Sequence, residues 1–332
     1  MVKQKYSKEM LLGFYRTMVR VRDFEETAAD CFTKGMLAGN IHLSIGEEAV
    51  AAGAIGAMEK NDYMTTTHRG HGHCLAKGGD VNKMMAEIFG KKTGYCKGKG
   101  GSMHIADVEG LCHLGANGIV GAGIPIATGS ALASKIRKDG HVTVCIFGDS
   151  ASNQGTFHES INMAAAWKLP AVYLIENNGY GVSTAIERVT NTKDLSVRAK
   201  GYDIPGKTVD GNDPVVVYEA MKEALEYARS GKGPYILECK TYRHQGHYCG
   251  DPAKYRPDSY MVNAHKHDCI KVMRAKLLAN KTATEKELAA IEKASLEEMA
   301  AAVKFSQESE YPDPSEAITE EYGSDNERSV AR

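Results

Sequence analysis

The stretch from residue 141 to residue 181 constrains the fold more than any other part of the chain. His141 to Phe147 is a short apolar run rich in β-branched residues, and Ala171 to Ile175 is a second. Such runs are typical of parallel strands buried on both faces. Between them, Thr156 to Lys168 carries apolar residues at helical spacing, and Leu169-Pro170 ends that helix. The stretch predicts two parallel strands joined by a right-handed helical crossover.

Polar residues follow both of these strands. Gly148-Asp149 comes directly after the first strand, and Asn177-Asn178 follows the second, with Asn178 standing 29 residues after Asp149. Each pair alone is more simply interpreted as a turn, because Gly-Asp and Asn-Asn are common turn sequences. Their spacing, however, matches one strand–helix–strand unit, and ligands bind at the carboxyl ends of strands in open α/β sheets. The side-chain oxygens therefore predict a Mg²⁺ or Ca²⁺ site that also serves phosphates.

Apolar segments continue to alternate along the rest of the chain. Three more runs are strand candidates, at residues 63–67, 206–210 and 235–240. Helix signals mark four further segments, at residues 7–34, after Ser44, at residues 119–134 and at residues 214–229. Strands and helices that alternate in this way predict an α/β fold with a doubly wound, mostly parallel sheet.

We divide the chain into three segments. Residues 1–60 are expected to form an N-terminal helical segment packed on the core, residues 61–258 the α/β core, and residues 259–332 a C-terminal helical extension. Two capping-box patterns support helix starts outside the core, one at Ser44 to Glu47 and one at Thr284 to Glu287.

Composition limits the classes of function. The net charge of −1 gives no electrostatic attraction to nucleic acid or to a membrane surface, and the sequence has no run of about 18 apolar residues. Its 8 cysteines form no C-x-x-C pair and several lie in apolar runs, which indicates reduced thiols. The first residues have neither the apolar core of a signal peptide nor room for a transit peptide. We therefore expect a cytoplasmic protein without nucleic-acid or membrane partners.

Three histidines follow the strand candidate at residues 63–67. His68, His71 and His73 are interspersed with Arg69 and two glycines. Zinc is one interpretation, but a zinc site wants tetrahedral ligands and a clear fourth partner. The glycines and Arg69 favour a loop that approaches an anion, because arginine can donate two parallel hydrogen bonds to a phosphate.

Residues 201–208 match the pattern G-x-x-x-x-G-K-T of phosphate-binding loops. Such a loop needs a strand before it and a helix that begins at the lysine. Here a polar, mixed segment precedes the match, a turn follows it, and the next helix signal comes only at Asp213-Pro214. We therefore reject nucleotide hydrolysis and predict a strand and turn at residues 206–210.

Two stretches together resemble a known enzyme family. Gly-Asp, about thirty residues and Asn-Asn form the signature of thiamine diphosphate enzymes. Residues 94–123 are glycine-rich and poor in periodicity, which alone indicates a flexible loop, but KGKGGSMH and GANGIVGAGIPIATG form a second signature. Both are similar to the alpha subunits of the first component of 2-oxo acid and acetoin dehydrogenase complexes. The resemblance covers residues 7–325 and implies the thiamine diphosphate-binding fold, with thiamine diphosphate and Mg²⁺ as cofactors.

The resemblance also implies roles for particular residues. Asp149, Asn178 and the carbonyl of Tyr180 are the implied Mg²⁺ ligands. Its catalytic residues are His42, which handles a substrate proton near the reacting carbon, and His247, which reaches the diphosphate from a mobile loop. The implied cofactor contacts are His68, Arg69, Gly118, Val120, Asp149, Ser150, Ala151, Asn178 and His247. Among these, the backbone of Gly118 and Val120 is expected to face the aminopyrimidine ring.

The chain departs from the family pattern at three positions. His68 stands where many members have tyrosine, and its donor capacity therefore depends on pH. Ser150 replaces the second glycine of Gly-Asp-Gly, although its hydroxyl can also donate a hydrogen bond. Tyr248 stands where some eukaryotic relatives carry a regulatory serine, so a serine switch is not expected here.

The motifs TTTHRGHGH, GSMHIADV and GTFHES favour acetoin as the substrate. The implied reaction is cleavage of acetoin, with acyl transfer to the lipoyl group of an acyltransferase component and release of acetaldehyde. Pyruvate or a branched-chain 2-oxo acid is the alternative, and a catalytically silent binding subunit is a further one. No glutamate of this chain matches the residue that activates the cofactor, so the resemblance implies a beta subunit and an α2β2 heterotetramer.

Overall fold

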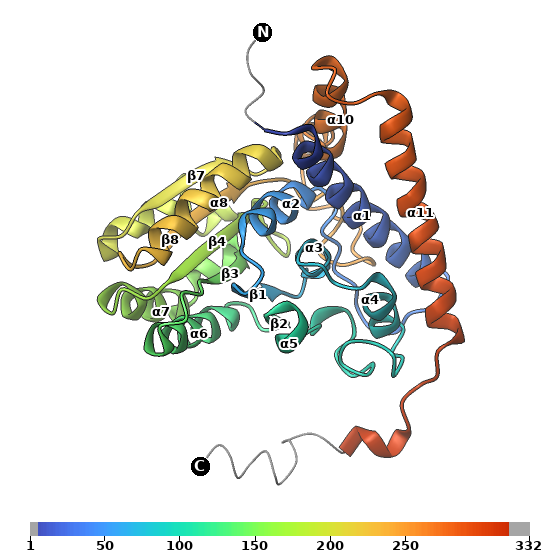
Figure 1. Ribbon diagram of the computed structural model, residues 1–332, viewed down its shortest axis with the longest axis horizontal. Coiled ribbons are helices and arrows are strands. Elements are labelled where there is room, and N and C mark those ends of the chain that lie inside the picture. Colours follow the sequence, from blue (N-terminus) through green and yellow to red (C-terminus); the bar gives the residue numbers. More distant parts are fainter. Residues whose placement is uncertain (1–5, 319–332) are drawn as a thin grey trace.

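A six-stranded sheet forms the centre of the computed structural model, which describes residues 6–318 (Figure 1). The strand order is β2-β1-β3-β4-β8-β7, and every neighbouring pair is parallel. The strands are β1 (Tyr63–Thr67), β2 (His113–Asn117), β3 (Thr143–Gly148), β4 (Ala171–Asn177), β7 (Gly206–Asp210) and β8 (Tyr235–Lys240). A short antiparallel pair, β5 (Tyr180–Gly181) and β6 (Thr184–Ala185), follows β4. The α/β class and the parallel sheet are thereby confirmed.

Helices cover both faces of this sheet, as in a doubly wound fold (Figure 1). One face is covered by α2 (Glu48–Ala57) and α8 (Pro214–Arg229), and the other by α6 (Gly123–Arg137) and α7 (Gly155–Ala166). Shorter helices connect the strands or follow β8, namely α3 (His71–Ala76), α4 (Val81–Ile88), α5 (Val108–Leu111) and α9 (Asp258–Lys266). The predicted helices at 156–168 and 119–134 are therefore present with shifted ends.

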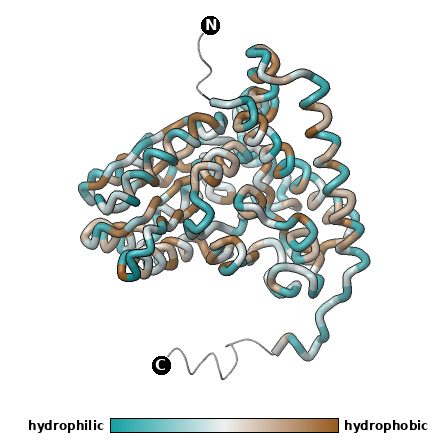
Figure 2. Tube along the Cα trace, in the orientation of Figure 1, coloured by the Kyte–Doolittle hydropathy of each residue, from teal (hydrophilic) through white to brown (hydrophobic). Residues whose placement is uncertain are grey.

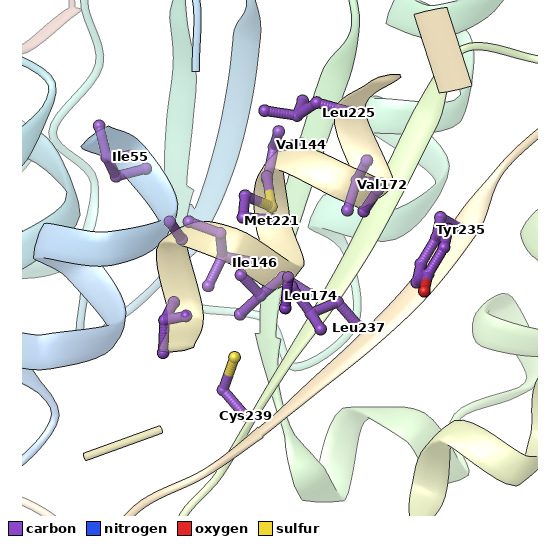
Figure 3. Packing of buried hydrophobic residues seen from close by; sticks show 14 of the residues in the cluster. Ile55, Val144, Ile146, Val172, Leu174, Met221, Leu225, Tyr235, Leu237 and Cys239 are labelled. Carbon is purple, nitrogen blue, oxygen red and sulfur yellow. The ribbon is translucent and has the colours of Figure 1, made fainter. Parts of the chain in front are cut away.

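The two faces of the sheet take alternate residues of each central strand. Val144 and Ile146 of β3 pack beneath α2 and α8, where Met221 and Leu225 also lie (Figure 3). Phe147, one residue further along β3, packs instead against α6 and α7. Both sets are buried, which explains why the strands appear in the sequence as unbroken apolar runs.

Three further helices, two of them long, form a layer beside the sheet (Figure 1). They are α1 (Lys8–Thr33), α10 (Cys269–Ala279) and α11 (Glu285–Glu308). Ser7 caps α1 by accepting a hydrogen bond from Met10 N, and Thr284 with Glu287 forms the predicted capping box of α11. Helix α11 alternates between hydrophilic and hydrophobic positions, which suits a helix with one packed face (Figure 2). The extensions proposed for 1–60 and 259–332 include residues 1–5 and 319–332, which lie outside the described residues.

The structure corrects two local predictions. The capping box at Ser44 to Glu47 is wrong: α2 begins at Glu48, and Ser44 Oγ donates to Glu25 Oε1 at 2.7 Å. Residues 94–123 are not only a loop, because β2 forms an edge of the sheet and the 3-10 helix η1 (Gly101–Met103) and α5 precede it.

The rejection of a phosphate-binding loop at 201–208 is confirmed. Lys207 and Thr208 lie within β7, whereas the helix that follows begins only at Pro214. Within residues 6–318, no helix is long and apolar enough to cross a membrane.

Candidate active site

A cavity of about 250 Å³ opens at the carboxyl ends of β1, β3 and β4. From β1 the chain proceeds to one edge of the sheet at β2, and it then returns to β3 on the other side of β1. The strand order therefore reverses between β1 and β3, and open α/β sheets bind ligands at such a switch point. Thr66 to Arg69 line the cavity after β1, and Ile146 to Ala151 line it after β3.

Asp149 supplies a buried carboxylate to this cavity. It is the first residue of the 3-10 helix η2 (Asp149–Asn153) and is only 2% exposed. Within the described chain, its Oδ2 atom has no hydrogen-bond partner. Burial raises the pKa of the Asp149 carboxyl to about 6, and backbone amides at Asp149 and Ser150 only partly oppose this. A buried carboxylate oxygen without a hydrogen-bond partner indicates a place for a cation.

Asn178 lies opposite, just beyond the end of β4, and its side chain is fixed by two neighbours. Its Nδ2 donates to Glu47 Oε1 at 2.7 Å, and its Oδ1 accepts from Tyr180 N at 3.2 Å. The Tyr180 carbonyl accepts from Arg243 Nη1 at 3.3 Å. Asp149, Asn178 and Tyr180 all line the same cavity, as the predicted cation site requires.

Glu47 was interpreted as a helix-capping residue, but the structure gives its carboxylate another position. It is 1% exposed, lines the cavity beside Glu176, and lies 3.7 Å from Arg69 Nε. Burial and the neighbouring Glu176 carboxylate raise the pKa of Glu47 to about 8. Its contact with Asn178 spans 131 residues of sequence, so no local pattern indicated it.

Two buried guanidinium groups, of Arg69 and Arg243, border the cavity. Arg69 donates to the carbonyls of Leu43 and His247, at 2.6 and 3.0 Å. Arg243 is absent from the predicted site residues. It is nevertheless 2% exposed, and it donates to the carbonyls of Tyr180 and Val182. Both positive charges lie where an anionic ligand of the cavity would be bound.

The structure gathers three histidines, but not the three that the sequence suggested. His42, His68 and His247 form a cluster with ring centroids 4.7 to 5.4 Å apart. His68 and His247 line the cavity, and His42 packs against both of them. The zinc interpretation of His68 with His71 and His73 is wrong, because the latter two lie in α3 and bond to other residues.

The remaining predicted contacts fall on two sides of the cavity. Ser150 and Ala151 line it after β3, and Val120 lines it beside α6. Gly118 is not among its lining residues; a Cβ there would approach His104 Nε2 to 2.9 Å. Ser150, which stands where the family pattern has glycine, lies against Gly181. A Cβ on Gly181 would approach Ser150 Oγ to 2.0 Å, so only glycine at position 181 leaves room for the serine side chain.

The loop that carries His247 is held by Asp251. The Asp251 carboxylate accepts from His247 N at 2.6 Å, from Ala253 N at 2.9 Å and from the Tyr255 hydroxyl at 2.6 Å. Partial burial alone would raise the pKa of Asp251, but these donors hold it at about 2. The carboxylate is therefore charged at every pH above about 4, so the hydrogen bonds of Asp251 that hold the loop do not change near neutral pH.

Replacing Asp251 with alanine is expected to loosen this loop, because three donors lose their acceptor at once. Limited proteolysis should cut residues 242–256 at least about tenfold faster in Asp251→Ala than in the unchanged chain, with little change in thermal unfolding. Asp258→Ala is the matched control, since Asp258 is an exposed acidic residue in the first turn of α9. Equal cutting of both variants would contradict the anchoring role.

A doubly wound α/β protein with buried charged side chains at its switch point belongs to the class that binds its ligands at the carboxyl ends of the strands. Residues 16–315 match the family described as "Dehydrogenase E1 component", and the chain belongs to this family. The family membership implied by the motifs is thereby confirmed. Enzymes of this family are oxidoreductases that depend on thiamine diphosphate.

Several bacterial proteins are similar to the chain over almost its full length. The alpha subunit of acetoin:2,6-dichlorophenolindophenol oxidoreductase of Bacillus subtilis is 48% identical over 95% of this chain and 94% of its own. The protein of the same name from Cupriavidus necator is 45% identical over 95% of each chain. The pyruvate dehydrogenase E1 component subunit alpha of Rhizobium meliloti is 44% identical over 95% of this chain and 91% of its own.

Proposed function

We propose that this chain is the alpha subunit of a thiamine diphosphate-dependent dehydrogenase that cleaves acetoin, transfers the acetyl group to a lipoyl arm and releases acetaldehyde. The observation that carries the proposal is the buried Asp149 carboxylate at the switch point of a chain of this family, whose Oδ2 atom has no hydrogen-bond partner among the described residues. The acetoin substrate is supported by two relatives named for acetoin, at 48% and 45% identity.

The cavity residues fit a diphosphate bound through a divalent cation. Asp149 offers an anionic oxygen without a partner, and Asn178 and the Tyr180 carbonyl offer neutral oxygens beside it. Oxygen ligands of this kind suit Mg²⁺, which commonly bridges a protein carboxylate and phosphates. The proposed Mg²⁺ ligands are therefore Asp149, Asn178 and the Tyr180 carbonyl.

Positive and neutral donors around this site suit the negative charge of a diphosphate. Arg69 is held by two carbonyls, so its guanidinium is oriented before a ligand arrives. We propose that Arg69, Arg243, His68 and His247 contact the diphosphate, and that Val120 and the adjoining Gly118 face the aminopyrimidine ring. Ser150 and Ala151 complete the lining on the β3 side.

When bound, thiamine diphosphate supplies a carbon nucleophile that adds to the substrate carbonyl and then acts as an electron sink. The substrate hydroxyl must lose its proton when the bond between the two oxygen-bearing carbons of acetoin breaks. We propose His42 as the acceptor, because it packs against His68 and His247, which line the cavity. Its Nδ1 atom has no partner within residues 6–318.

The cavity mouth suits a second subunit. Ile119, Val120 and Val182 line the cavity and are 75%, 47% and 54% exposed. Exposed apolar residues around a ligand site are typical of an interface. We propose that a beta subunit covers them in an α2β2 heterotetramer, which works with a lipoyl-bearing acyltransferase. The eight cysteines, all free and all in the described part of the chain, support a reducing cytoplasmic location.

Pyruvate is the second candidate substrate, because the Rhizobium meliloti relative named for pyruvate is nearly as similar, at 44% identity. Pyruvate brings a carboxylate that a site must recognise, whereas acetoin brings a neutral hydroxyethyl group. A site that pairs polar groups with one of these substrates leaves them unpaired with the other.

In the reconstituted complex, we expect kcat/KM for acetoin to exceed that for pyruvate by at least about a hundredfold. Reduction of an artificial electron acceptor measures both substrates under the same conditions. A larger kcat/KM for pyruvate than for acetoin would move the chain to the pyruvate branch of the family and leave the cofactor site unaffected.

A further inference from the structure

Three segments far apart in the sequence bring one imidazole each to a common point. His42 precedes α2, His68 follows β1, and His247 lies in the loop after β8. Each offers a ring nitrogen, and these three nitrogens all lie within 4.8 Å of one another. In a tetrahedral zinc site the ligand nitrogens are about 3.4 Å apart, given Zn–N bonds of about 2.1 Å.

The three side chains are of a type that binds metals. A neutral imidazole has a nitrogen lone pair to donate, and it is the commonest metal ligand in proteins.

Within the described chain, two ring nitrogens of this cluster are unused, as are both nitrogens of the buried His113. In the described residues, Nδ1 of His42 and Nδ1 of His247 are buried and have no hydrogen-bond partner. His71, in contrast, bonds through both of its nitrogens, to Glu25 and to Ser102. Buried polar atoms without partners are rare, and an ion is one of the few things that satisfies them.

Charges of both signs surround the cluster. The guanidinium groups of Arg69 and Arg243 repel a cation, and Glu47 does not offset them near neutral pH, because its pKa is raised to about 8. The carboxylates of Asp149 and Glu176, which line the adjoining cavity, attract a cation. Ligand type then selects the ion, because nitrogen ligands suit Zn²⁺ and similar transition metals, whereas Mg²⁺ prefers oxygen.

We propose that His42, His68 and His247 form a second metal site, which binds Zn²⁺ or a similar divalent transition-metal ion through three imidazoles and leaves a fourth position open to water. This site is distinct from the oxygen-ligand site at Asp149 and Asn178. An ion there occupies the lone pair of His42, so Zn²⁺ inhibits turnover. Only this inhibition rests on the proposed function; the binding itself does not.

Co²⁺ is the probe for the first test, because a four-coordinate Co²⁺ ion absorbs strongly in the visible region and a hexahydrated one does not. The full chain without an affinity tag is titrated with Co²⁺ in the presence of millimolar Mg²⁺, without thiamine diphosphate or substrate. One Co²⁺ per chain with strong visible bands, displaced by Zn²⁺, is the expected result. Weak bands typical of six-coordinate Co²⁺, or no saturation, would overturn the proposal.

Variants assign the ligands. Each of His42→Gln, His68→Gln and His247→Gln should weaken Co²⁺ binding by at least about tenfold. Mutation of a residue that only hydrogen-bonds to a metal ligand already lowers metal affinity by about that factor. His141→Gln is the matched control, because this histidine lies at the opposite end of β3 and should leave binding unchanged. Equal affinity in all four variants would rule out the cluster.

X-ray absorption at the zinc edge of the unaltered chain covers the case in which a variant does not fold. Three nitrogen ligands and one oxygen support the site, and a shell of oxygen ligands alone contradicts it. If the chain binds zinc but the reconstituted complex turns over neither acetoin nor pyruvate, the metal site is supported and the proposed function is contradicted. If turnover is normal and Zn²⁺ does not inhibit it, only the proposed inhibition is contradicted.

Discussion

Replacing Asp149 with alanine is expected to weaken thiamine diphosphate binding by more than about a hundredfold in the presence of Mg²⁺, while the fold survives. Asp149 is the anionic ligand of the proposed cation site; Asn178 and the Tyr180 carbonyl offer only neutral oxygens. Without this carboxylate the cation must be held by neutral oxygens beside the phosphates that it bridges. Isothermal titration calorimetry with thiamine diphosphate and Mg²⁺ measures the loss directly.

Thermal unfolding separates a binding defect from a folding defect. The Asp149 carboxylate is buried, its Oδ2 has no partner in the described chain, and burial raises its pKa to about 6. A buried anion in this state costs stability, so Asp149→Ala should unfold at the same temperature as the unchanged chain or at a higher one. Asp139→Ala, in the exposed turn before β3, should change neither quantity. Unchanged cofactor affinity in Asp149→Ala would falsify the metal assignment.

The part of the site that the sequence revealed is the part that local structure creates. Asp149 and Asn178 directly follow two neighbouring strands, and β3 pairs with β4 in the parallel register that the single helical crossover requires. Apolar runs predicted both strands because each is buried on its two faces. Once the strands are parallel and adjacent, their carboxyl ends must meet, whatever the rest of the chain does.

The parts that the sequence did not reveal depend on long-range contacts. The capping pattern at Ser44 to Glu47 failed because Glu25 and Asn178 provide partners for those side chains from distant segments. The histidine cluster joins residues 42, 68 and 247, whereas sequence spacing drew attention to His71 and His73. Strand β2 lies at an edge of the sheet with a break in its register against β1, so its sequence lacks the apolar run of a central strand.

The isolated chain is expected to show no turnover with either acetoin or pyruvate, and addition of the beta subunit should restore it. Thiamine diphosphate is activated by a glutamate that bonds to its aminopyrimidine ring, and the carboxyl must reach that ring at hydrogen-bond distance. The cavity of this chain contains Glu47 and Glu176. Glu47 bonds to Asn178, and Glu176 is the penultimate residue of β4, so both lie on the side proposed for the cation. The ring is expected beside Val120, in the segment between β2 and α6.

The test compares the chain alone with the reconstituted complex, in an assay with an artificial electron acceptor. Ile119→Lys places a charge on a 75% exposed residue of the cavity mouth and should prevent the beta subunit from restoring activity. Val262→Lys is the matched control, since Val262 is 66% exposed on α9 and does not line the cavity.

Turnover by a chain rigorously free of beta subunit would mean that Glu47 or Glu176 reaches the ring, and variants of these two residues would then identify which. A cavity of about 250 Å³, smaller than the roughly 300–1,000 Å³ usual for small-molecule sites, argues against that outcome, because it suits half of a site that a second subunit completes.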